Sequence, residues 1–448
     1  MKKILKYVAY IIAIVLVYFG YTTYPKLDLI SGFSAKSIAS AHFIDQRPQQ
    51  LIETTDNDIP LISLAKNQIN NLQKWASASV FGLKERKAIY REGLGATLIN
   101  DTYDPDAKVY VPKRQRLASN IPFPYGNGKP KDSIFETIDY QKLEQAVTEA
   151  FDLEGQKFKR TRSVLVLYKD HLIAEKYTQG FNQQSKILGW SMTKSLTATY
   201  FGILEHQGKF DIKKPAPIAA WQTDERKNIT TNDLLHMNSG LEWDENYNEI
   251  SDATKMLFLA SDMGQVQLEK KAIFKPNTHW NYSSGTTNLL SKILRNQFPT
   301  QQAYLDFWYQ ELIDKIGMHS MIVETDMSGQ FVGSSYGWAT TRDWSKLGLL
   351  YLHQGKWNGE TIFDPSWAKY VATPTANSNQ NYGAHFWLNA GKRFPDVPSD
   401  MYYCSGFQGQ MVAIIPSYDL VIVRMGLQEN PKFDFNQLIS RIVKSIQK

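Results

Sequence analysis

The chain has almost no cysteine. Of its 448 residues only Cys404 carries a thiol, which excludes an intramolecular disulfide framework and any metal site built from several cysteines. It also lacks a dominant charge, because 50 Lys and Arg residues are offset by 44 Asp and Glu residues, for a formal net charge of +6. The basic residues are scattered, so we expect no nucleic-acid partner. Internal repeats of the solenoid type and low-complexity segments are absent as well.

What the chain does have is enough apolar material for a folded core. It is 43% hydrophobic and 13% aromatic, which excludes a disordered protein. Its length allows two compact units, or one large unit with additions. His236 and His385 do not have the mutual spacing of metal ligands. We therefore expect neither a metal ion nor another cofactor.

The N-terminus has the pattern of a membrane anchor. Lys2, Lys3 and Lys6 precede an uncharged run from Tyr7 to Pro25, which is long enough to cross a bilayer. Lysines before such a run favour a cytoplasmic N-terminus and export of the residues after the run. We predict an uncleaved single-pass anchor in the inner membrane, with the rest of the chain in the periplasm or outside the cell. A cleaved signal is the alternative, although the small-x-small site at Ala39 to Ala41 lies far beyond the run.

Composition divides the chain into three predicted parts. Residues 1–26 are the anchor or signal, residues 27–131 are an N-terminal extension and linker, and residues 132–448 are the main domain. The linker is recognised by the many Pro, Asp, Asn and Gly residues between Asn100 and Pro130. We find no candidate chemistry before residue 132, so the function is expected in the main domain.

Apolar periodicity predicts how the main domain begins and ends. A helix is expected over Ile138 to Phe151, followed by strands over Ser163 to Tyr168 and Leu172 to Tyr177. The far end has two strands around the Pro416 to Asp419 turn and a closing helix over Phe435 to Ile446. Hairpins at both ends with helices between them predict an α+β fold, in which helices flank an antiparallel sheet whose first and last strands are neighbours.

A Ser-x-x-Lys motif opens the longest amphipathic run in the middle of the chain, at Gly189 to Ser195. If a helix begins there, Ser191 and Lys194 lie one turn apart on the same face. A partly buried lysine loses its charge more readily and can then take the proton of a nucleophilic serine. Backbone N–H groups at the helix start can stabilise a developing oxyanion. The motif is short, and by itself it also fits an exposed helix start.

Three later stretches strengthen the catalytic interpretation. Leu234 to Trp243 is an apolar helix end stopped at a Ser-Gly turn. Trp280 to Gly285 places Tyr282 two residues before the hydroxyl of Ser284. Cys404 to Gln410 is punctuated by glycines directly before the final hairpin, which suits a strand whose backbone approaches a ligand closely.

In this order the motifs resemble those of the serine β-lactamases and penicillin-binding proteins. They are most similar to the branch with class C β-lactamases, family VIII esterases and 6-aminohexanoate-dimer hydrolase. The resemblance covers about residues 132–448. It implies a β-lactamase/transpeptidase-like fold in which a helical subdomain accompanies the antiparallel sheet, and an acyl-enzyme mechanism that needs no cofactor.

The resemblance also implies the roles of four side chains. Ser191 would attack the substrate carbonyl, and Lys194 would accept its proton or orient the proton relay. Tyr282 would be the second acid/base group, which protonates the leaving group and later activates water. Ser284 stands where many relatives have asparagine and would hydrogen-bond the lysine or the substrate. The acids Glu242, Asp244 and Glu245 are expected on a solvated loop, with a place in the lining of the cleft as the alternative.

The strand before the final hairpin departs from the family pattern. The resemblance implies an oxyanion hole of the Ser191 and Phe407 N–H groups, with Ser405 and Gly406 on the substrate-binding strand. Where the family has Lys-Thr-Gly, this chain has Cys404 in the lysine position. The missing cation would hold a β-lactam carboxylate and favour an ionised tyrosine. We therefore predict an exported serine hydrolase that cleaves a carboxylic ester or a linear amide, with a small-molecule ester, amide or peptide as substrate.

Other functions stay open at this point. One is β-lactamase or D-alanyl-D-alanine peptidase activity, and another is a catalytically inactive protein of this fold that binds ligands in the cell envelope. A third is an α/β-hydrolase, because Gly333 to Gly337 matches Gly-x-Ser-x-Gly and would use Ser335 with Asp364 and His385. That motif needs a strand immediately before the serine, and the preceding residues indicate a loop. The sequence determines neither the substrate nor the oligomeric state.

Overall fold

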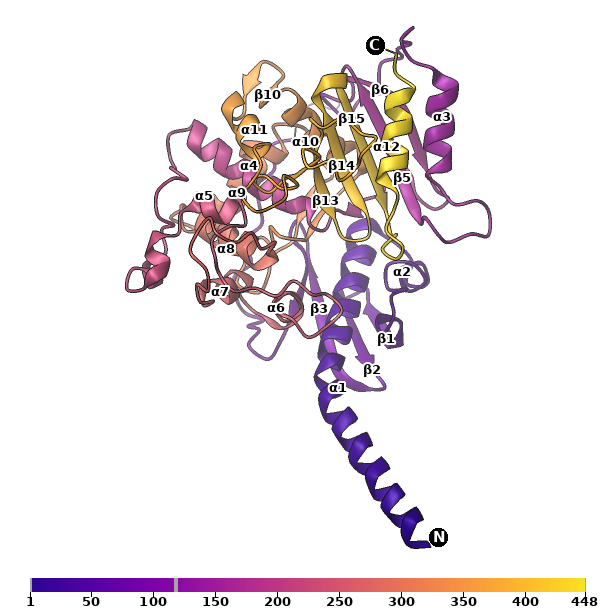
Figure 1. Ribbon diagram of the computed structural model, residues 1–448, viewed down its shortest axis with the longest axis vertical. Helices are drawn as coiled ribbons and strands as arrows, with labels where there is room; N and C mark the ends of the chain where they lie inside the picture. The colour runs from indigo at the N-terminus through magenta and orange to yellow at the C-terminus, as the bar shows by residue number, and fades with distance from the viewer. Residues whose placement is uncertain (1, 117–119, 448) are drawn as a thin grey trace. The chain divides into compact units, whose positions relative to one another are not determined.

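The computed structural model describes residues 2–116 and 120–447 (Figure 1). The chain divides into two compact units. Unit 1 consists of residues 1–91, 95–105 and 246–261, and unit 2 consists of residues 92–94, 106–245 and 262–448. The domain boundaries expected at residues 26 and 131 stay predictions.

Unit 1 packs one long helix on a small sheet. Helix α1 (Lys2–Asp45) contributes small buried residues such as Ala35 and Ala39, and the sheet contributes Ala76 and Ala88. Small side chains on both sides allow the helix to approach the strands closely. The sheet is antiparallel in the order β1-β2-β3-β4. Its strands are β1 (Ala65–Asn70), β2 (Trp75–Val80), β3 (Leu83–Arg91) and β4 (Gly95–Ile99), and the unit also holds α2 (Gln49–Glu53), η1 (Ile62–Leu64) and α6 (Asp252–Leu259).

The run from Tyr7 to Pro25, expected to span a membrane, is helical and forms part of α1. Over the described residues, however, no helix is long and apolar enough to cross a bilayer. The predicted transmembrane helix is therefore not supported. The helix continues through Pro25 to Asp45, and most of its residues from Leu29 to Ile44 are buried within unit 1.

Unit 2 is built on a six-stranded antiparallel sheet in the order β12-β13-β14-β15-β5-β6. Strand β5 pairs with β15, for example Val164 with Arg424 and Tyr168 with Leu420. The first and last strands are therefore neighbours, as predicted, and Figure 1 shows them side by side. The six strands are β5 (Thr161–Tyr168), β6 (His171–Tyr177), β12 (Trp387–Leu388), β13 (Tyr402–Gly406), β14 (Gln410–Ile415) and β15 (Leu420–Gly426).

Helices cover both faces of this sheet because its strands are apolar on both sides. Val164 and Val166 pack in the cluster that holds α3 (Tyr140–Glu149) and α12 (Phe435–Lys444). Leu165 and Leu167 point the other way, into the cluster that holds α4 (Met192–His206) and α10 (Thr341–Leu352). Such alternation is what a strand buried on both faces requires. The α+β prediction, with helices flanking an antiparallel sheet, is confirmed, as are the hairpins and helices expected near both ends of the main domain.

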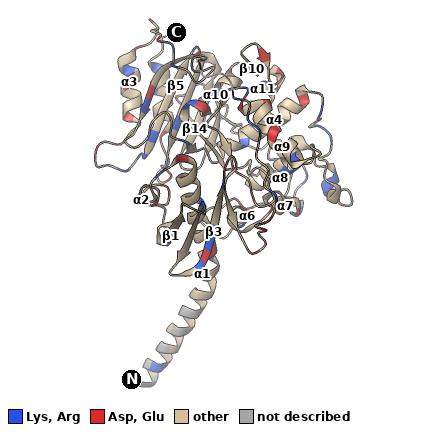
Figure 2. Cartoon of the chain, turned by 180° about the vertical axis from the view of Figure 1, so that it is seen from behind, with Lys and Arg blue, Asp and Glu red and all other residues tan. Residues whose placement is uncertain are grey.

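The remaining elements of unit 2 lie between β7 and β13 along the chain. They form a second small sheet in the order β7-β9-β8, a hairpin of β10 and β11, and a set of short helices. Lys and Arg residues are interspersed with Asp and Glu residues along these elements (Figure 2). The elements are β7 (Ile187–Leu188), η2 (Ala219–Trp221), η3 (Glu225–Asn228), α5 (Thr231–Leu235), α7 (Met263–Leu268), α8 (Ser284–Arg295), α9 (Gln301–Trp308), η4 (Tyr309–Ile313), β8 (Ile322–Val323), β9 (Gly337–Ala339), β10 (Lys356–Trp357), β11 (Glu360–Thr361) and α11 (Pro365–Val371).

Candidate active site

Ser191 lies at the N-cap of α4, directly after a sharp change of chain direction. The turn is made by Trp190, whose φ of 47° is in the left-handed region. Two hydrogen bonds hold this turn, because Gly189 N–H donates to the Gly337 carbonyl at 2.8 Å and Gly337 N–H donates to Thr193 Oγ1 at 3.0 Å. The helix predicted to open at the Ser-x-x-Lys motif is therefore confirmed, with its first residues tied to strand β9.

Lys194 lies one turn further along α4 and is 1% exposed. Its Nζ has three hydrogen-bond partners, each at 2.9 Å: Ser191 Oγ, Ser284 Oγ and the carbonyl oxygen of Ser334. Burial lowers the pKa of Lys194 to about 8, although the nearby Glu245 carboxylate opposes the shift. A lysine with this pKa is partly neutral near pH 8 and can then accept a proton from the serine hydroxyl beside it.

Tyr282 lies next to Ser191 and Lys194. Lys194 Nζ lies 5.0 Å from the centroid of the Tyr282 ring, and Tyr282 is only partly buried, as is Ser191. Burial raises the pKa of the Tyr282 phenol above its usual value, the negative charge of Glu245 raises it further, and a hydrogen bond with Ser191 lowers it. The phenol is therefore neutral in the resting protein. The structure brings together Ser191, Lys194, Tyr282 and Ser284, the four side chains for which the sequence predicted roles.

Glu245 follows the alternative given for the three acids of its loop, a place beside the candidate site. The solvated loop expected for all three acids holds for Glu242 and Asp244, which are exposed. Glu245 is partly buried instead, and its Oε1 accepts a hydrogen bond from Ser284 Oγ at 2.5 Å. Its Oε2 accepts from Ser284 N–H at 2.9 Å and from Trp243 Nε1 at 2.5 Å. No sequence motif marked this contact, because the loop of Glu245 and helix α8 are far apart in the chain.

The end of strand β13 closes on the turn before Ser191. A side chain at Gly406 would place its Cβ 2.1 Å from the Gly189 carbonyl oxygen, so only glycine fits there. Phe407 follows, and its ring packs edge-on against Trp190 with centroids 5.6 Å apart. The backbone of position 407 is thus beside the turn that carries Ser191. This arrangement agrees with the expected oxyanion hole, whose function stays a prediction.

The two residues before Gly406 have different surroundings. Cys404 is fully buried on β13, and burial raises the pKa of its thiol to about 12. A thiol that keeps its proton at neutral pH is a poor nucleophile. Ser405 is partly buried on the same strand, where it pairs with Met411. Cys404 therefore acts as a small apolar side chain, at the position where the resemblance implied that relatives have lysine.

Aromatic rings pack beside the Tyr282 ring. The Tyr282 ring lies 5.3 Å from that of Trp387 and 5.8 Å from that of Tyr382, measured between centroids. Trp280 packs on the same two rings at 6.1 and 5.4 Å. Such rings provide apolar surface beside the reacting groups.

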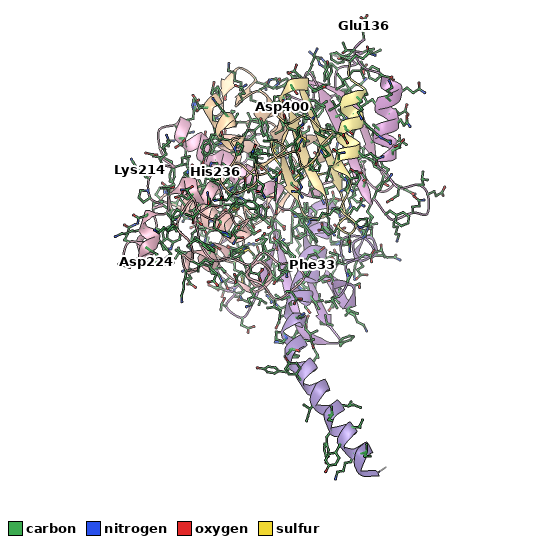
Figure 3. The ribbon with its side chains drawn as sticks, in the orientation of Figure 1. Phe33, Glu136, Lys214, Asp224, His236 and Asp400 are labelled. Carbon is green, nitrogen blue, oxygen red and sulfur yellow. The ribbon has the colours of Figure 1, made fainter. Side chains whose placement is uncertain are left out.

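The histidines considered from the sequence take structural roles. His236, labelled in Figure 3, lies 2.5 Å from Thr375 Oγ1 through its Nδ1, and burial lowers its pKa to about 4. His385 bonds the Leu235 carbonyl and Thr287, with burial as the main cause that lowers its pKa to about 3. Over residues 2–116 and 120–447, no cluster of three or more His, Cys, Asp or Glu residues could hold a metal ion.

The α/β-hydrolase alternative is not supported. Asp364 caps helix α11 by accepting from Ser366 N–H, and Ser335 Oγ lies 2.8 Å from Ser334 Oγ. A turn, and not a strand, precedes Ser335. The central sheet of unit 2 is antiparallel, whereas the nucleophile elbow belongs to a strand-turn-helix unit of a hydrolase sheet.

Fold and site together define a β-lactamase/transpeptidase-like α+β hydrolase fold. Comparison with known proteins agrees. The family model described as Beta-lactamase matches residues 155–444, which is more than half of the chain, so the chain belongs to the β-lactamase family. No curated protein sequence matches the chain. Solved structures of the same fold include an esterase, an amide hydrolase and a β-lactamase.

Three solved structures illustrate the likeness. A protein of Bacillus anthracis described as a 6-aminohexanoate-dimer hydrolase has a TM-score of 0.57 at 20% identity, with 78% of this chain and 90% of that chain covered. A family VIII carboxylesterase has a TM-score of 0.51 at 13% identity, with 71% and 100% covered. A class C β-lactamase mutant has a TM-score of 0.52 at 14% identity, with 70% and 100% covered. At these identities the likeness concerns the fold.

Proposed function

We propose that the protein hydrolyses a carboxylic ester or a linear amide through an acyl-enzyme on Ser191. The observation that carries the proposal is the environment of Lys194. Its Nζ is buried and lies 2.9 Å from Ser191 Oγ, with its pKa lowered to about 8. A serine hydroxyl needs such a base, because it is a weak nucleophile while it keeps its proton.

The proposed reaction uses the side chains of Ser191, Lys194 and Tyr282. Neutral Lys194 takes the proton of Ser191 as Oγ attacks the substrate carbonyl carbon, and the oxyanion that forms is held by the N–H groups of Ser191 and Phe407. Neutral Tyr282 passes its proton to the leaving alcohol or amine, and the proton on Lys194 restores it. Water then attacks the acyl-enzyme with the same groups acting in reverse, and the free acid leaves.

Esters and linear amides are favoured over β-lactams by the charges near the site. Cys404 supplies no cation for a substrate carboxylate, and Glu245 adds a negative charge that would repel one. The names of two neighbours of the same fold, a 6-aminohexanoate-dimer hydrolase and a family VIII carboxylesterase, point the same way. β-Lactamase or D-alanyl-D-alanine peptidase activity is the second candidate, favoured by the family match. A ligand-binding protein without activity is the third.

Covalent labelling tests the nucleophile without knowledge of the substrate. The purified full-length protein is treated with an alkyl fluorophosphonate, and the intact mass and the modified peptide are measured. We expect one adduct, on Ser191, and no adduct in Ser191→Ala. Ser335→Ala is the matched control and should be labelled like the unmodified chain. If Ser191 is never labelled, the proposal fails and the inactive binding protein is favoured.

We also propose that the protein is exported. The support is the N-terminal pattern of Lys2, Lys3 and Lys6 before the uncharged run of Tyr7 to Pro25. Fractionation of cells that express the tagged chain, with sequencing of its mature N-terminus, tests this. Recovery of the uncleaved chain only in the cytoplasmic fraction would contradict export.

A further inference from the structure

Lys194 must be neutral to act as a base, and neutral lysine has two N–H groups and one lone pair. Three oxygen atoms surround its Nζ at 2.9 Å, from Ser191, Ser284 and Ser334. Only one of the three can donate a hydrogen to the lone pair. Catalysis requires that this one is Ser191, and a different choice would leave the base pointing away from the nucleophile.

Two of the three oxygens are prevented from donating. The Ser334 atom is a backbone carbonyl oxygen, which can only accept. The Ser284 hydroxyl has a single hydrogen, and this hydrogen is donated to Glu245 Oε1 at 2.5 Å. Its oxygen therefore faces Lys194 as an acceptor. Both N–H groups of the neutral lysine are used on these two acceptors, and its lone pair is left for the Ser191 hydroxyl.

We propose that Glu245 is a positioning residue: through the Ser284 hydroxyl, its carboxylate directs the lone pair of neutral Lys194 at the nucleophile. The inference rests on the proposed function and adds a residue to it. As Ser191 Oγ forms its bond to the substrate, its proton moves onto the lone pair of Lys194. The resulting ammonium group then donates to all three oxygens, so no side chain has to rotate during the step.

The direction of the Ser284 hydrogen bond depends on the charge of Glu245. Its Oε2 accepts from two N–H groups, of Ser284 and Trp243, and only an oxygen can serve there. In Glu245→Gln the amide oxygen must take that place, so the NH₂ group falls where Oε1 was. That NH₂ group donates to the Ser284 hydroxyl, whose own hydrogen then turns to the lone pair of Lys194. A one-atom substitution thus reverses the hydrogen bond and diverts the base from Ser191.

The electrostatic effect of the Glu245 carboxylate on Lys194 predicts the opposite change in the reaction rate of Ser191. The titratable groups that face Lys194 are Glu245, Tyr282 and His385. The Glu245 carboxylate raises the pKa of Lys194, so its removal gives more neutral lysine at pH 7. If Glu245 acted only through its charge, Glu245→Gln would react faster at neutral pH. Positioning predicts that it reacts more slowly.

The experiment measures the second-order rate of labelling by an alkyl fluorophosphonate, which reports the reactivity of Ser191 for any substrate. We expect Glu245→Gln to lower the maximal rate by about 10²-fold, the loss typical of a misdirected general base. The midpoint of its rate-against-pH curve should move to lower pH. A merely structural role would not move this midpoint, and melting temperature is measured alongside to show that the variant folds. Glu242→Gln, on the exposed neighbouring acid, is the matched control.

A second variant keeps the inference falsifiable. Ser284→Ala removes the hydroxyl whose hydrogen bond is reversed in Glu245→Gln. The labelling rate of Ser284→Ala should therefore fall by only about 10-fold. Adding Glu245→Gln to Ser284→Ala should have little further effect, and the double variant should be labelled faster than Glu245→Gln alone. If the rate loss of the double variant equals the product of the two single losses, Glu245 does not act through Ser284 and its positioning role is overturned. Loss of labelling in every variant, the unmodified chain included, would instead overturn the proposed function.

Discussion

The Cβ of any larger residue at position 406 would lie 2.1 Å from the carbonyl oxygen of Gly189. This relationship joins two segments that are distant in the chain, the end of β13 and the turn before Ser191. Because both are backbone, neither can move aside as a flexible side chain would. The distance between the nucleophile and position 407 is therefore set by the absence of a side chain at Gly406.

Gly406→Ala tests that dependence. The added methyl group must push the Gly189 carbonyl and the Ser191 turn away from β13. We expect kcat/KM for an ester substrate to fall by about 10²-fold, as displacements of about 1 Å commonly cost. Gly20→Ala is the control, since a Cβ at Gly20 meets nothing within 4 Å. Full activity in Gly406→Ala would show that the close approach of β13 has no role in the reaction.

The pH dependence of acylation follows from Lys194. Only the neutral lysine is a base, and its pKa is about 8. The labelling rate of Ser191 should therefore rise with pH through a midpoint of about 8. A midpoint near 10.5, the ordinary lysine value, would contradict the buried environment of Lys194.

The free energy of unfolding should also depend on the protonation of Lys194. Its folded-state pKa of about 8 is below the ordinary value of 10.5, so between these values the unfolded chain binds more protons on Lys194 than the folded chain does. The contribution of Lys194 to the free energy of unfolding therefore rises with pH across that window. Comparing urea unfolding of the unmodified chain and of Lys194→Met at both ends of the window isolates this contribution. A difference between the two that does not change with pH would contradict it.

Arg424 is predicted to hold the turn after Gly406. It is 1% exposed, and its Nη1 donates to the carbonyls of Gln408 at 3.1 Å and Gly409 at 2.7 Å. Arg424→Met would leave these carbonyls without the donor, and we expect it to lower the free energy of unfolding by about 3 kcal/mol. It should also lower ester turnover, because the turn adjoins Phe407. Denaturant unfolding measures the first effect, with the exposed Arg116→Met as control, and unchanged stability would refute the role.

Substrate preference tests the argument from Cys404. We expect hydrolysis of short-chain p-nitrophenyl esters to exceed nitrocefin turnover. A lysine placed at this position should raise nitrocefin turnover relative to ester turnover, since it supplies the cation that the β-lactam carboxylate lacks. The steady-state kcat/KM values of the unmodified chain and of Cys404→Lys with both substrates measure this. Higher nitrocefin than ester turnover in the unmodified chain would show the argument to be wrong.

The local pattern of the sequence was sufficient for much of the fold. Alternating and continuous apolar runs predicted β5, β6, β14, β15 and the closing helix, because burial on a sheet or helix face imposes a period that the residues display. The order of the strands followed from the same hairpins. Unit 1 could not be predicted in this way, because β1 and β2 are short and polar on one side. The residues that β2 buries are small, such as Ala76 and Ala78, and give no clear apolar pattern.

The sequence by itself identified the candidate nucleophile and its candidate base. Ser191 and Lys194 lie one turn apart on one helix, and helix geometry alone brings them to the same face. Only the tertiary structure decided which acid is linked to Lys194 through Ser284. Glu245 reaches Ser284 across 39 positions of the chain, and its neighbours Glu242 and Asp244 face solvent. Three similar acids on one loop differ only in their contacts after folding, and such contacts leave no period or motif in the chain.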